Sequence, residues 1–360
     1  MIRLKEIVRE AFRNTRSGTS RPLLAVITFL LSVGLLACLQ ASLILQRNQA
    51  AFDWRASGSS IKIVSATGAI DGFRCVSLNE IDGVAASAAF RTGSDVSLSV
   101  LPSNPIKLVE ATWTAGRILR LADSANATGA WVASDLANTL KLSERGKPEL
   151  AVIGGGTIPV SNIYPHVEDG RMPILSNTIV STVPASGVFD SCWVEIWPES
   201  KELESLLLFP VIPDNLPPNS QPEIRQLNSS GGPSFLQKYG SSDFDCAFSA
   251  VAVALGAALG FILIRLRRLE LASTLHAGID KASLCLQSII ESLLWLTPGI
   301  AMSLGFLGLL SVTSNPEAPS TVFLPGLVVL LLGTFSVLVS TFGNTLAIKE
   351  SQLFEFFKRR

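Results

Sequence analysis

The residues best suited to chemistry in this sequence are charged side chains that lie between and within two long apolar runs. Arg267, Arg268 and Glu270 directly follow an uncharged segment, and Glu291 lies inside the next apolar run. Guanidinium and carboxylate groups form strong, charge-assisted hydrogen bonds with groups of opposite charge. We therefore expect these residues to offer a charged surface to a partner in the cytoplasm.

Glu291 belongs to a predicted polar face of the apolar run. Ser288, Glu291 and Ser292 recur at steps of three and four, so they share one face of a helix. An ionised carboxylate that faces lipid costs roughly 2.5–3.5 kcal/mol on insertion scales. We therefore expect these residues to face the interior of a helix bundle, or Glu291 to reach the membrane interface at the nearby helix end.

Catalytic and metal-binding motifs are missing from the sequence. It contains two histidines, His166 and His276, and no H-E-x-x-H, no G-x-S-x-G and no Cys/His set with zinc spacing. The glycine run 154–156 lacks the Lys-Ser/Thr that completes a phosphate-binding loop. We therefore predict that the chain is not an enzyme, holds no metal or cofactor of its own and cannot hydrolyse ATP by a P-loop mechanism.

The charged cluster starts a predicted loop of two short helical pieces over residues 265–282. Gly278 is placed to end the first helix, and Asp280 to cap the next one. Five apolar residues recur at steps of three and four and predict one stripe along the loop: Leu266, Leu269, Ala272, Leu275 and Ile279.

The composition indicates a membrane protein. Of the 360 residues, 48% are hydrophobic and 16% charged, and the mean hydropathy is +0.41. A membrane-spanning helix needs about 20 predominantly apolar residues. Four runs satisfy this length, and we predict membrane spans over residues 22–46, 246–264, 283–312 and 322–348. Gly256 and Gly260 have the small-xxx-small spacing that allows close helix contact, so they are a candidate dimer face.

Two other interpretations of the first apolar run are a cleaved signal peptide and a lipoprotein leader. The residues 35–38, Leu-Leu-Ala-Cys, resemble a lipoprotein cleavage box in which Cys38 would be acylated. The run continues for eight residues beyond Cys38, however, and is longer than the apolar core of a signal peptide. These lengths favour a retained span.

Residues 47–245 are polar and rich in turn residues, and they predict an α+β domain. A short helix is expected over residues 135–142, and the proline-rich segment 212–234 is a candidate linker without regular structure. Cys75 and Cys192 are the two cysteines of this region, and either a disulfide between them or two free thiols fits the sequence. Strands are predicted over residues 60–64, 96–101, 106–111, 149–153, 157–160, 178–183 and 191–196.

The loop at 265–282 resembles the cytoplasmic loop of FtsX/MacB-type ABC transporter permeases. The resemblance rests on an Arg-Arg-x-Glu start, an Ala-rich turn, a glycine eight residues after the glutamate and a second glutamate thirteen residues later. In that family this loop docks onto a separate ATPase subunit. The matching positions are Arg267, Arg268, Glu270, Ala272, Leu275, Ala277, Gly278 and Glu291.

A weaker resemblance links the middle of the chain to the extracytoplasmic core domain of MacB-type permeases. It rests on Gly116 to Leu119 with Asp123, on residues 131–134 with Leu136 and Ala137, and on the residues from Gly154 to Val160. The fold it implies is an α-helical membrane protein with four transmembrane helices and an α+β extracytoplasmic domain between the first and second. At its C-terminus the chain has Ser351 to Phe357 where family members often have Pro-x-x-Ala-Leu-Arg, so contacts of that tail do not carry over.

The distribution of basic residues predicts the topology. Lys and Arg gather in the amphipathic segment 1–21, in the coupling loop 265–282 and in the tail 349–360, and the positive-inside rule places all three in the cytoplasm. The domain 47–245 is then outside, and the turn 313–321 is a short outer loop. Helix 1–21 is expected to lie along the membrane surface, and the alternative is a basic arm in solvent.

The resemblance implies a permease subunit that works with an ATPase dimer and a second permease chain, identical or paralogous, in the cell membrane. ATP and Mg²⁺ would bind to the ATPase, and the cargo would be a peptide, an antibiotic or a lipid-linked molecule. One alternative is a regulator that transports nothing and passes on ATP-driven motion to an external cell-wall enzyme (mechanotransmission). Another alternative is a membrane-anchored sensor or enzyme without an ATPase. No feature of the sequence points to nucleic acid.

Overall fold

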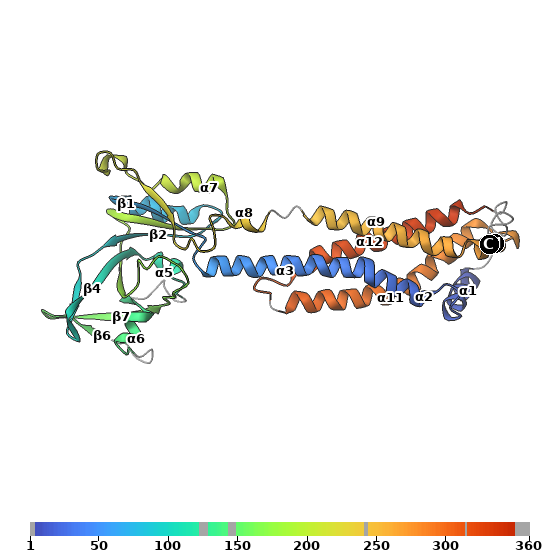
Figure 1. Cartoon of the computed structure of the whole chain (residues 1–360), viewed down its shortest axis with the longest axis horizontal. Coiled ribbons are helices and arrows are strands. Elements are labelled where there is room, and N and C mark those ends of the chain that lie inside the picture. Colours follow the sequence, from blue (N-terminus) through green and yellow to red (C-terminus); the bar gives the residue numbers. More distant parts are fainter. Residues whose placement is uncertain (1–3, 122–128, 143–148, 241–243, 314, 350–360) are drawn as a thin grey trace. The chain divides into compact units, whose positions relative to one another are not determined.

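The structure, a computed structural model, describes residues 4–121, 129–142, 149–240, 244–313 and 315–349. Contacts within the chain divide it into a helical unit, Met1–Ala50 with Ser241–Arg360, and a sheet unit, Ala51–Gly240 (Figure 1). Asp123, which belongs to the weaker resemblance, and the tail beyond Lys349 lie outside the described residues.

Four helices in the described part of the chain are long and apolar enough to cross a membrane. The first is a continuous helix over Pro22–Ala56, made of α2 (Pro22–Phe29), a π-helical turn (Leu30–Gly34) and α3 (Leu35–Ala56). The others are α9 (Phe244–Leu266), α11 (Lys281–Val312) and α12 (Ser320–Ala347). Two shorter helices belong to this unit, α1 (Leu4–Arg16) and α10 (Arg268–His276).

The first helix extends well beyond residue 46, where its apolar run ends. Polar residues such as Asn48 and Gln49 continue the helix. Beyond them, Ala51 and Trp54 are buried again, and Trp54 packs edge-on against Phe235 within the sheet unit. The end of an apolar run therefore predicts where the membrane-spanning part of a helix ends. It does not predict where the helix itself ends.

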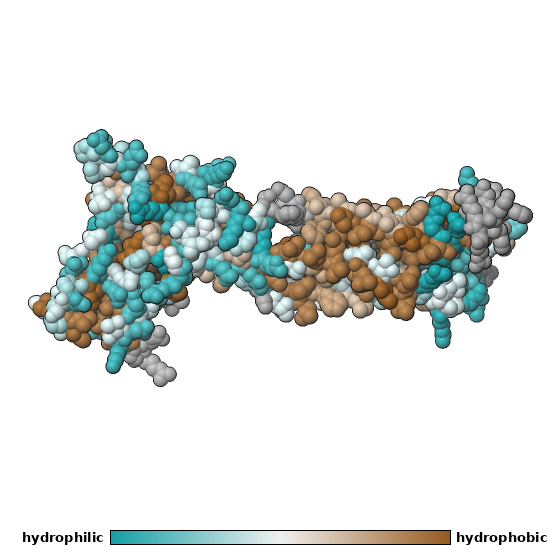
Figure 2. Space-filling model, in the orientation of Figure 1, coloured by the Kyte–Doolittle hydropathy of each residue, from teal (hydrophilic) through white to brown (hydrophobic). Residues whose placement is uncertain are grey.

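Apolar side chains cover the visible surface of the helical unit between its polar ends (Figure 2). Many of them are exposed within the chain itself, among them Leu23, Leu31 and Phe335 at 73%, 68% and 67%. An exposed apolar surface of this extent is unfavourable in water and favourable in contact with lipid.

The glycine pair 256 and 260 joins two helices of the same chain and is not available as a dimer face. A Cβ atom at Gly256 would collide with the backbone of Gly333, and one at Gly260 would lie 2.7 Å from the carbonyl oxygen of Val337. Next to these contacts, the hydroxyl of Ser336 donates to the carbonyl of Val253 at 2.7 Å. The small residues thus allow α9 and α12 to pack backbone to backbone.

The sheet unit contains a mixed sheet with the strand order β10-β1-β9-β2-β4-β8-β5-β7-β6, and β3 pairs with β4. Most neighbours are antiparallel, whereas β4–β8 and β5–β7 are parallel. The strands are β1 (Ile61–Asp71), β2 (Val84–Thr92), β3 (Val96–Leu98), β4 (Leu101–Thr112), β5 (Ala130–Ala133), β6 (Glu149–Ala151), β7 (Thr157–Tyr164), β8 (Thr178–Val183), β9 (Val188–Ile196) and β10 (Glu223–Gln226). The short helices are α4 (Gly72–Ser77), α5 (Ala115–Ile118), α6 (Ser134–Thr139), α7 (Lys201–Ser205) and α8 (Phe235–Tyr239).

Three strands, β2, β5 and β10, correct the expectations from sequence. β5 is only four residues long and is held by pairing with β7 and β8. β2 was not predicted, because its run of alanines has low intrinsic strand preference, yet it pairs with both β9 and β4 and is buried in its middle. β10 lies inside the segment 212–234, for which we expected no regular structure. Residues 223–226 contain no proline, so their backbone is free to pair with β1 as an edge strand.

Candidate functional site

Arg267 lies at the start of α10, at the centre of a buried charge cluster. Its side chain is 10% exposed and donates two hydrogen bonds of 3.1 Å to the carboxylate of Glu270. It also donates to Glu291 of α11. Burial lowers the pKa of Arg267, but the hydrogen bonds with Glu270 and the charge of Glu291 outweigh this effect and raise it above its usual value. Arg267 is thus a permanent cation that holds α10 against α11.

Glu291 is the most deeply buried member of the charge cluster, at 2% exposure. Besides Arg267, it accepts hydrogen bonds from Asn14 of α1 at 2.9 Å and from Gln287, one turn earlier on α11, at 3.1 Å. Asn14 is a member of the cluster that the sequence analysis missed, since one asparagine in a basic helix has no distinguishing pattern. The cluster therefore joins α1, α10 and α11.

Ser288 and Ser292 are buried on the same side of α11 as Glu291, at 3% and 6% exposure. The hydroxyl of Ser288 donates to the carbonyl of Leu284 at 3.0 Å, within its own helix. The polar face that the spacing predicts therefore lies inside the protein, and Glu291 is the member of this face that forms hydrogen bonds to other helices.

The apolar side of α10 is formed by Leu271, Ala272 and Leu275, which pack with Ile264 and Leu284. The expected stripe is wrong at Leu266, which is 51% exposed. The chain leaves helical geometry at Arg267, whose φ and ψ are −107° and 7°, and this break shifts the phase of the following helix. Spacings of three and four residues that are counted across Arg267 therefore combine residues from different faces of α9 and α10.

Gly278 ends α10 and Asp280 begins α11. Gly278 has a φ of +89°, and the amide of Ile279 donates back to the carbonyl of Thr274 at 3.3 Å, as in a left-handed helix cap. The carboxylate of Asp280 accepts from the hydroxyl of Ser283 at 2.6 Å and from its amide at 3.1 Å, and these hydrogen bonds lower the pKa of Asp280. The two caps hold the bend between the helices.

The outward side of the loop is polar. Ser273, His276 and Gly278 are exposed, Glu270 keeps 35% of its side chain in solvent, and Arg268 is partly exposed. The five predicted coupling residues thus serve different purposes. Arg267 and Leu275 hold the loop in place, Gly278 shapes it, and Arg268 and Glu270 are accessible to a partner.

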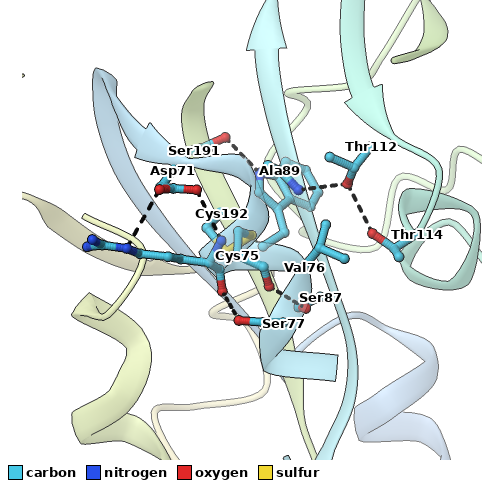
Figure 3. The surroundings of a disulfide bond; sticks show 12 residues. Asp71, Cys75, Val76, Ser77, Ser87, Ala89, Thr112, Thr114, Ser191 and Cys192 are labelled. Atoms are coloured by element: carbon cyan, nitrogen blue, oxygen red, sulfur yellow. Dashed lines mark hydrogen bonds and ion pairs between the residues drawn. A yellow bond between two sulfur atoms is a disulfide. The ribbon is translucent and has the colours of Figure 1, made fainter. Parts of the chain in front are cut away.

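In the sheet unit, Cys75 of α4 and Cys192 of β9 form a disulfide, with a Cα–Cα distance of 5.9 Å and a separation of 117 positions in sequence (Figure 3). Both cysteines are fully buried. The hydroxyl of Ser87 in β2 donates to the carbonyl of Cys75 at 2.7 Å, and Asp71 caps α4 by accepting from the amide of Phe73 at 2.9 Å. The disulfide thus fastens α4 onto the sheet.

A second buried carboxylate, Glu195 of β9, binds the end of α3. It is 5% exposed and accepts from the guanidinium of Arg55 at 3.1 Å and from the hydroxyl of Ser60 at 3.3 Å. Arg120 lies 3.8 Å from the same carboxylate and donates to the carbonyl of Arg55. The last turn of α3 is therefore anchored in the sheet unit by charge.

Among the residues that the structure describes, no group of three or more His, Cys, Asp or Glu side chains could hold a metal ion. His166 donates its backbone amide to the hydroxyl of Ser134 at 2.8 Å and lines a cavity, while His276 lies on the exposed side of α10.

Neither a protein-family model nor a curated protein matches the sequence. Among solved structures, the chain is similar to the periplasmic region of MacB from Actinobacillus actinomycetemcomitans, with 7% identity and a TM-score of 0.32 over 44% of this chain and 84% of that one. It is also similar to a domain of a predicted permease from Porphyromonas gingivalis, with 13% identity and a TM-score of 0.32 over 47% and 90% of the two chains.

Proposed function

We propose that this chain is the permease subunit of an FtsX/MacB-type ABC transporter. A separate ATPase dimer would bind ATP and Mg²⁺ and dock onto the loop at 265–282. The permease would work as a pair of chains and convert ATP-driven motion into a conformational change of the sheet unit. Its cargo would be a peptide, an antibiotic or a lipid-linked molecule.

The observation that carries the proposal is the ion-paired cluster of Arg267, Glu270 and Glu291. A nine-residue helix such as α10 is marginal by itself in water, so contacts with its neighbours must hold it. The cluster and the apolar side of α10 supply these contacts and leave Ser273, His276 and part of Glu270 facing solvent. Because these contacts fix α10 to the long helix α11, a displacement of α10 by a docked partner can be transmitted to the helix bundle.

The same cluster gives α1 a role in the proposed coupling. Asn14 binds Glu291 directly, and Ile7 and Ala11 of α1 are buried, whereas Leu4 and Phe12 remain 62% and 55% exposed. These two exposed apolar residues lie among basic ones and would enter the membrane surface. Displacement of α10 would therefore reach α1 as well as α11.

We place both termini and the loop at 265–282 in the cytoplasm, and the sheet unit outside. The basic flanks of the spans support this orientation, and so does the disulfide, because disulfides persist in oxidising compartments outside the cytoplasm. A second permease chain would have to contact a face other than the one with Gly256 and Gly260, which α12 occupies.

Co-purification with a candidate ABC ATPase subunit from the same organism tests the proposal. Gly278→Val forces a β-branched residue into a left-handed conformation, although a Cβ atom meets open space, and the strain should distort the bend. Glu270→Arg reverses the accessible charge, and Ser273→Trp blocks the exposed side without touching the ion pairs. We expect all three variants to insert normally, to lose at least tenfold in ATPase association and to lose the stimulation of ATP turnover in nanodiscs.

Ser220→Trp is the matched control, since it places the same indole on an exposed serine of the sheet unit. It should bind the ATPase like the wild type. Wild-type association and turnover in all three loop variants would contradict the docking role of this loop. Association without any cargo movement would support the regulator that transports nothing.

A further inference from the structure

The sheet unit contains a cavity of about 140 Å³ that has an apolar floor and a cationic rim. Buried side chains form the floor, including Ile61, Ile118, Leu175 and Trp193. For comparison, an apolar cavity of about 150 Å³ accommodates a benzene molecule. The cavity therefore offers space for one apolar group of about six carbon atoms.

The rim of the cavity carries Arg120, Arg171 and His166. Arg171 is fully engaged, because it forms hydrogen bonds of 2.7 and 2.8 Å with both carboxylate oxygens of Asp169. Arg120 is different: its side chain is 41% exposed, and its guanidinium lies 3.8 Å from Glu195, beyond hydrogen-bonding distance. One of its nitrogens donates to the neutral carbonyl of Arg55, so its charge is available to a ligand through the remaining donors.

The charges around Arg120 do not balance. Within the described residues, Glu195 is the carboxylate that forms ion pairs with both Arg55 and Arg120, so two cations share one anion. Glu195 already accepts hydrogen bonds from Arg55 and Ser60, so its ion pair with Arg120 is the weaker of its two ion pairs. Among the residues that the structure describes, one positive charge in excess therefore lies beside an apolar cavity.

The backbone of Arg120 adds a second observation. Its φ of +58° is in the left-handed region, which residues with a Cβ atom adopt at a cost. This conformation caps the C-terminus of α5, since the amide of Leu121 donates back to the carbonyl of Gly116 at 2.8 Å. The helix cap therefore fixes the position of the residue that carries the excess charge.

We propose that this cavity binds an apolar carboxylate, with its apolar group on the floor and its carboxylate on the guanidinium of Arg120. A planar guanidinium is well suited to bind a carboxylate through two hydrogen bonds. The ligand is either the C-terminal residue of a peptide or a small fatty acid, since both combine these groups. The inference stands on the sheet unit alone and does not depend on the proposed ATPase partner.

Ligand-observed NMR titrations of the full chain in nanodiscs test this site, with empty nanodiscs as the blank. The probes are N-acetyl-leucine and hexanoate, together with their uncharged amides. We expect at least one acid to bind at least tenfold more tightly than its amide. Preference for N-acetyl-leucine identifies a peptide C-terminus, and equal or tighter binding of hexanoate identifies a simple apolar acid.

Two variants and one control locate the binding. Arg120→Gln should weaken the acid at least tenfold and leave the amide unchanged. Val167→Trp fills the mouth of the cavity from an exposed position and should weaken both. Arg117→Gln removes an exposed arginine three residues away that does not line the cavity, and it should bind like the wild type. Absence of acid binding in the wild type, acid affinity no greater than that of the amide, or equal losses in Arg120→Gln and Arg117→Gln would overturn the proposal.

Discussion

Glu291 is the residue on which the helical unit depends for its charge balance. Removing one member of a buried ion pair leaves the other without compensation, which costs about 3–5 kcal/mol, whereas replacing both members by apolar residues is often neutral. If Glu291 is removed, Arg267 is the charge that loses a partner. It still forms an ion pair with Glu270.

We therefore predict that Glu291→Leu lowers the stability of the purified protein by about 3 kcal/mol. Glu291→Gln should cost less, because an amide oxygen can still accept from Asn14. The double variant Arg267→Met/Glu291→Leu should recover part of the loss. Thermal unfolding in detergent measures the series, and equal stability of wild type, Gln and Leu variants would mean that Glu291 contributes nothing to packing.

A pH-dependent contribution to stability is expected at Asp169. Hydrogen bonds from Arg171 lower the pKa of this carboxyl below its usual value. A carboxyl whose pKa is lower in the folded state stabilises the protein above the unfolded-state pKa of about 3.9 and loses this effect as the pH falls through the folded-state pKa.

Asp169→Asn should therefore be less stable than the wild type at pH 7, and the difference should shrink as the pH falls below about 4. Urea unfolding of the full chain between pH 3 and pH 7 measures it. A stability difference that stays constant over this range would show that the negative charge of Asp169 is not the cause.

At the scale of elements, the disulfide fixes α4 to β9 and divides the cysteines into two classes. Cys38, Cys246 and Cys285 are free, and Cys75 and Cys192 are paired. We predict that alkylation of the unfolded protein without reductant modifies three thiols, and that alkylation after reduction modifies five. Intact mass gives the count, and five modified thiols before reduction would contradict the pairing.

Helices and strands with a strong sequence pattern could be predicted, and those without one could not. The four apolar runs and the strands rich in β-branched residues were evident, because burial in lipid or in a sheet imposes composition directly. β2 was missed, since its alanines are buried by neighbours that no local pattern reveals. The linker around β10 was misjudged, because pairing with β1 is a long-range contact.

Predictability at the candidate site differed from residue to residue. Arg267, Glu270 and Glu291 were evident from charge next to apolar runs. Their partner Asn14 comes from 277 residues away in sequence, and no local spacing encodes such a contact. The excess charge at Arg120 likewise depends on a contact between three residues, Arg55, Arg120 and Glu195, that are far apart in sequence.

At the scale of the whole molecule, the proposal requires one topology. A cysteine introduced at Asn215 in the sheet unit should react with an impermeant thiol reagent from outside the cell. One introduced at Ser273 in α10 should react only after the membrane is opened. Labelling of the Asn215 position from the cytoplasmic side alone would invert the orientation and remove the loop at 265–282 from the reach of an ATPase.

The central claim is that the exposed side of α10 contacts an ATPase subunit, and site-specific cross-linking tests it most directly. A photoreactive cross-linker attached at Ser273→Cys, in a background without free cysteines, should capture the co-expressed ATPase. The same cross-linker at Asn215→Cys should not. Equal capture of the ATPase from both positions, or none from Ser273→Cys in a complex that hydrolyses ATP, would contradict the claim.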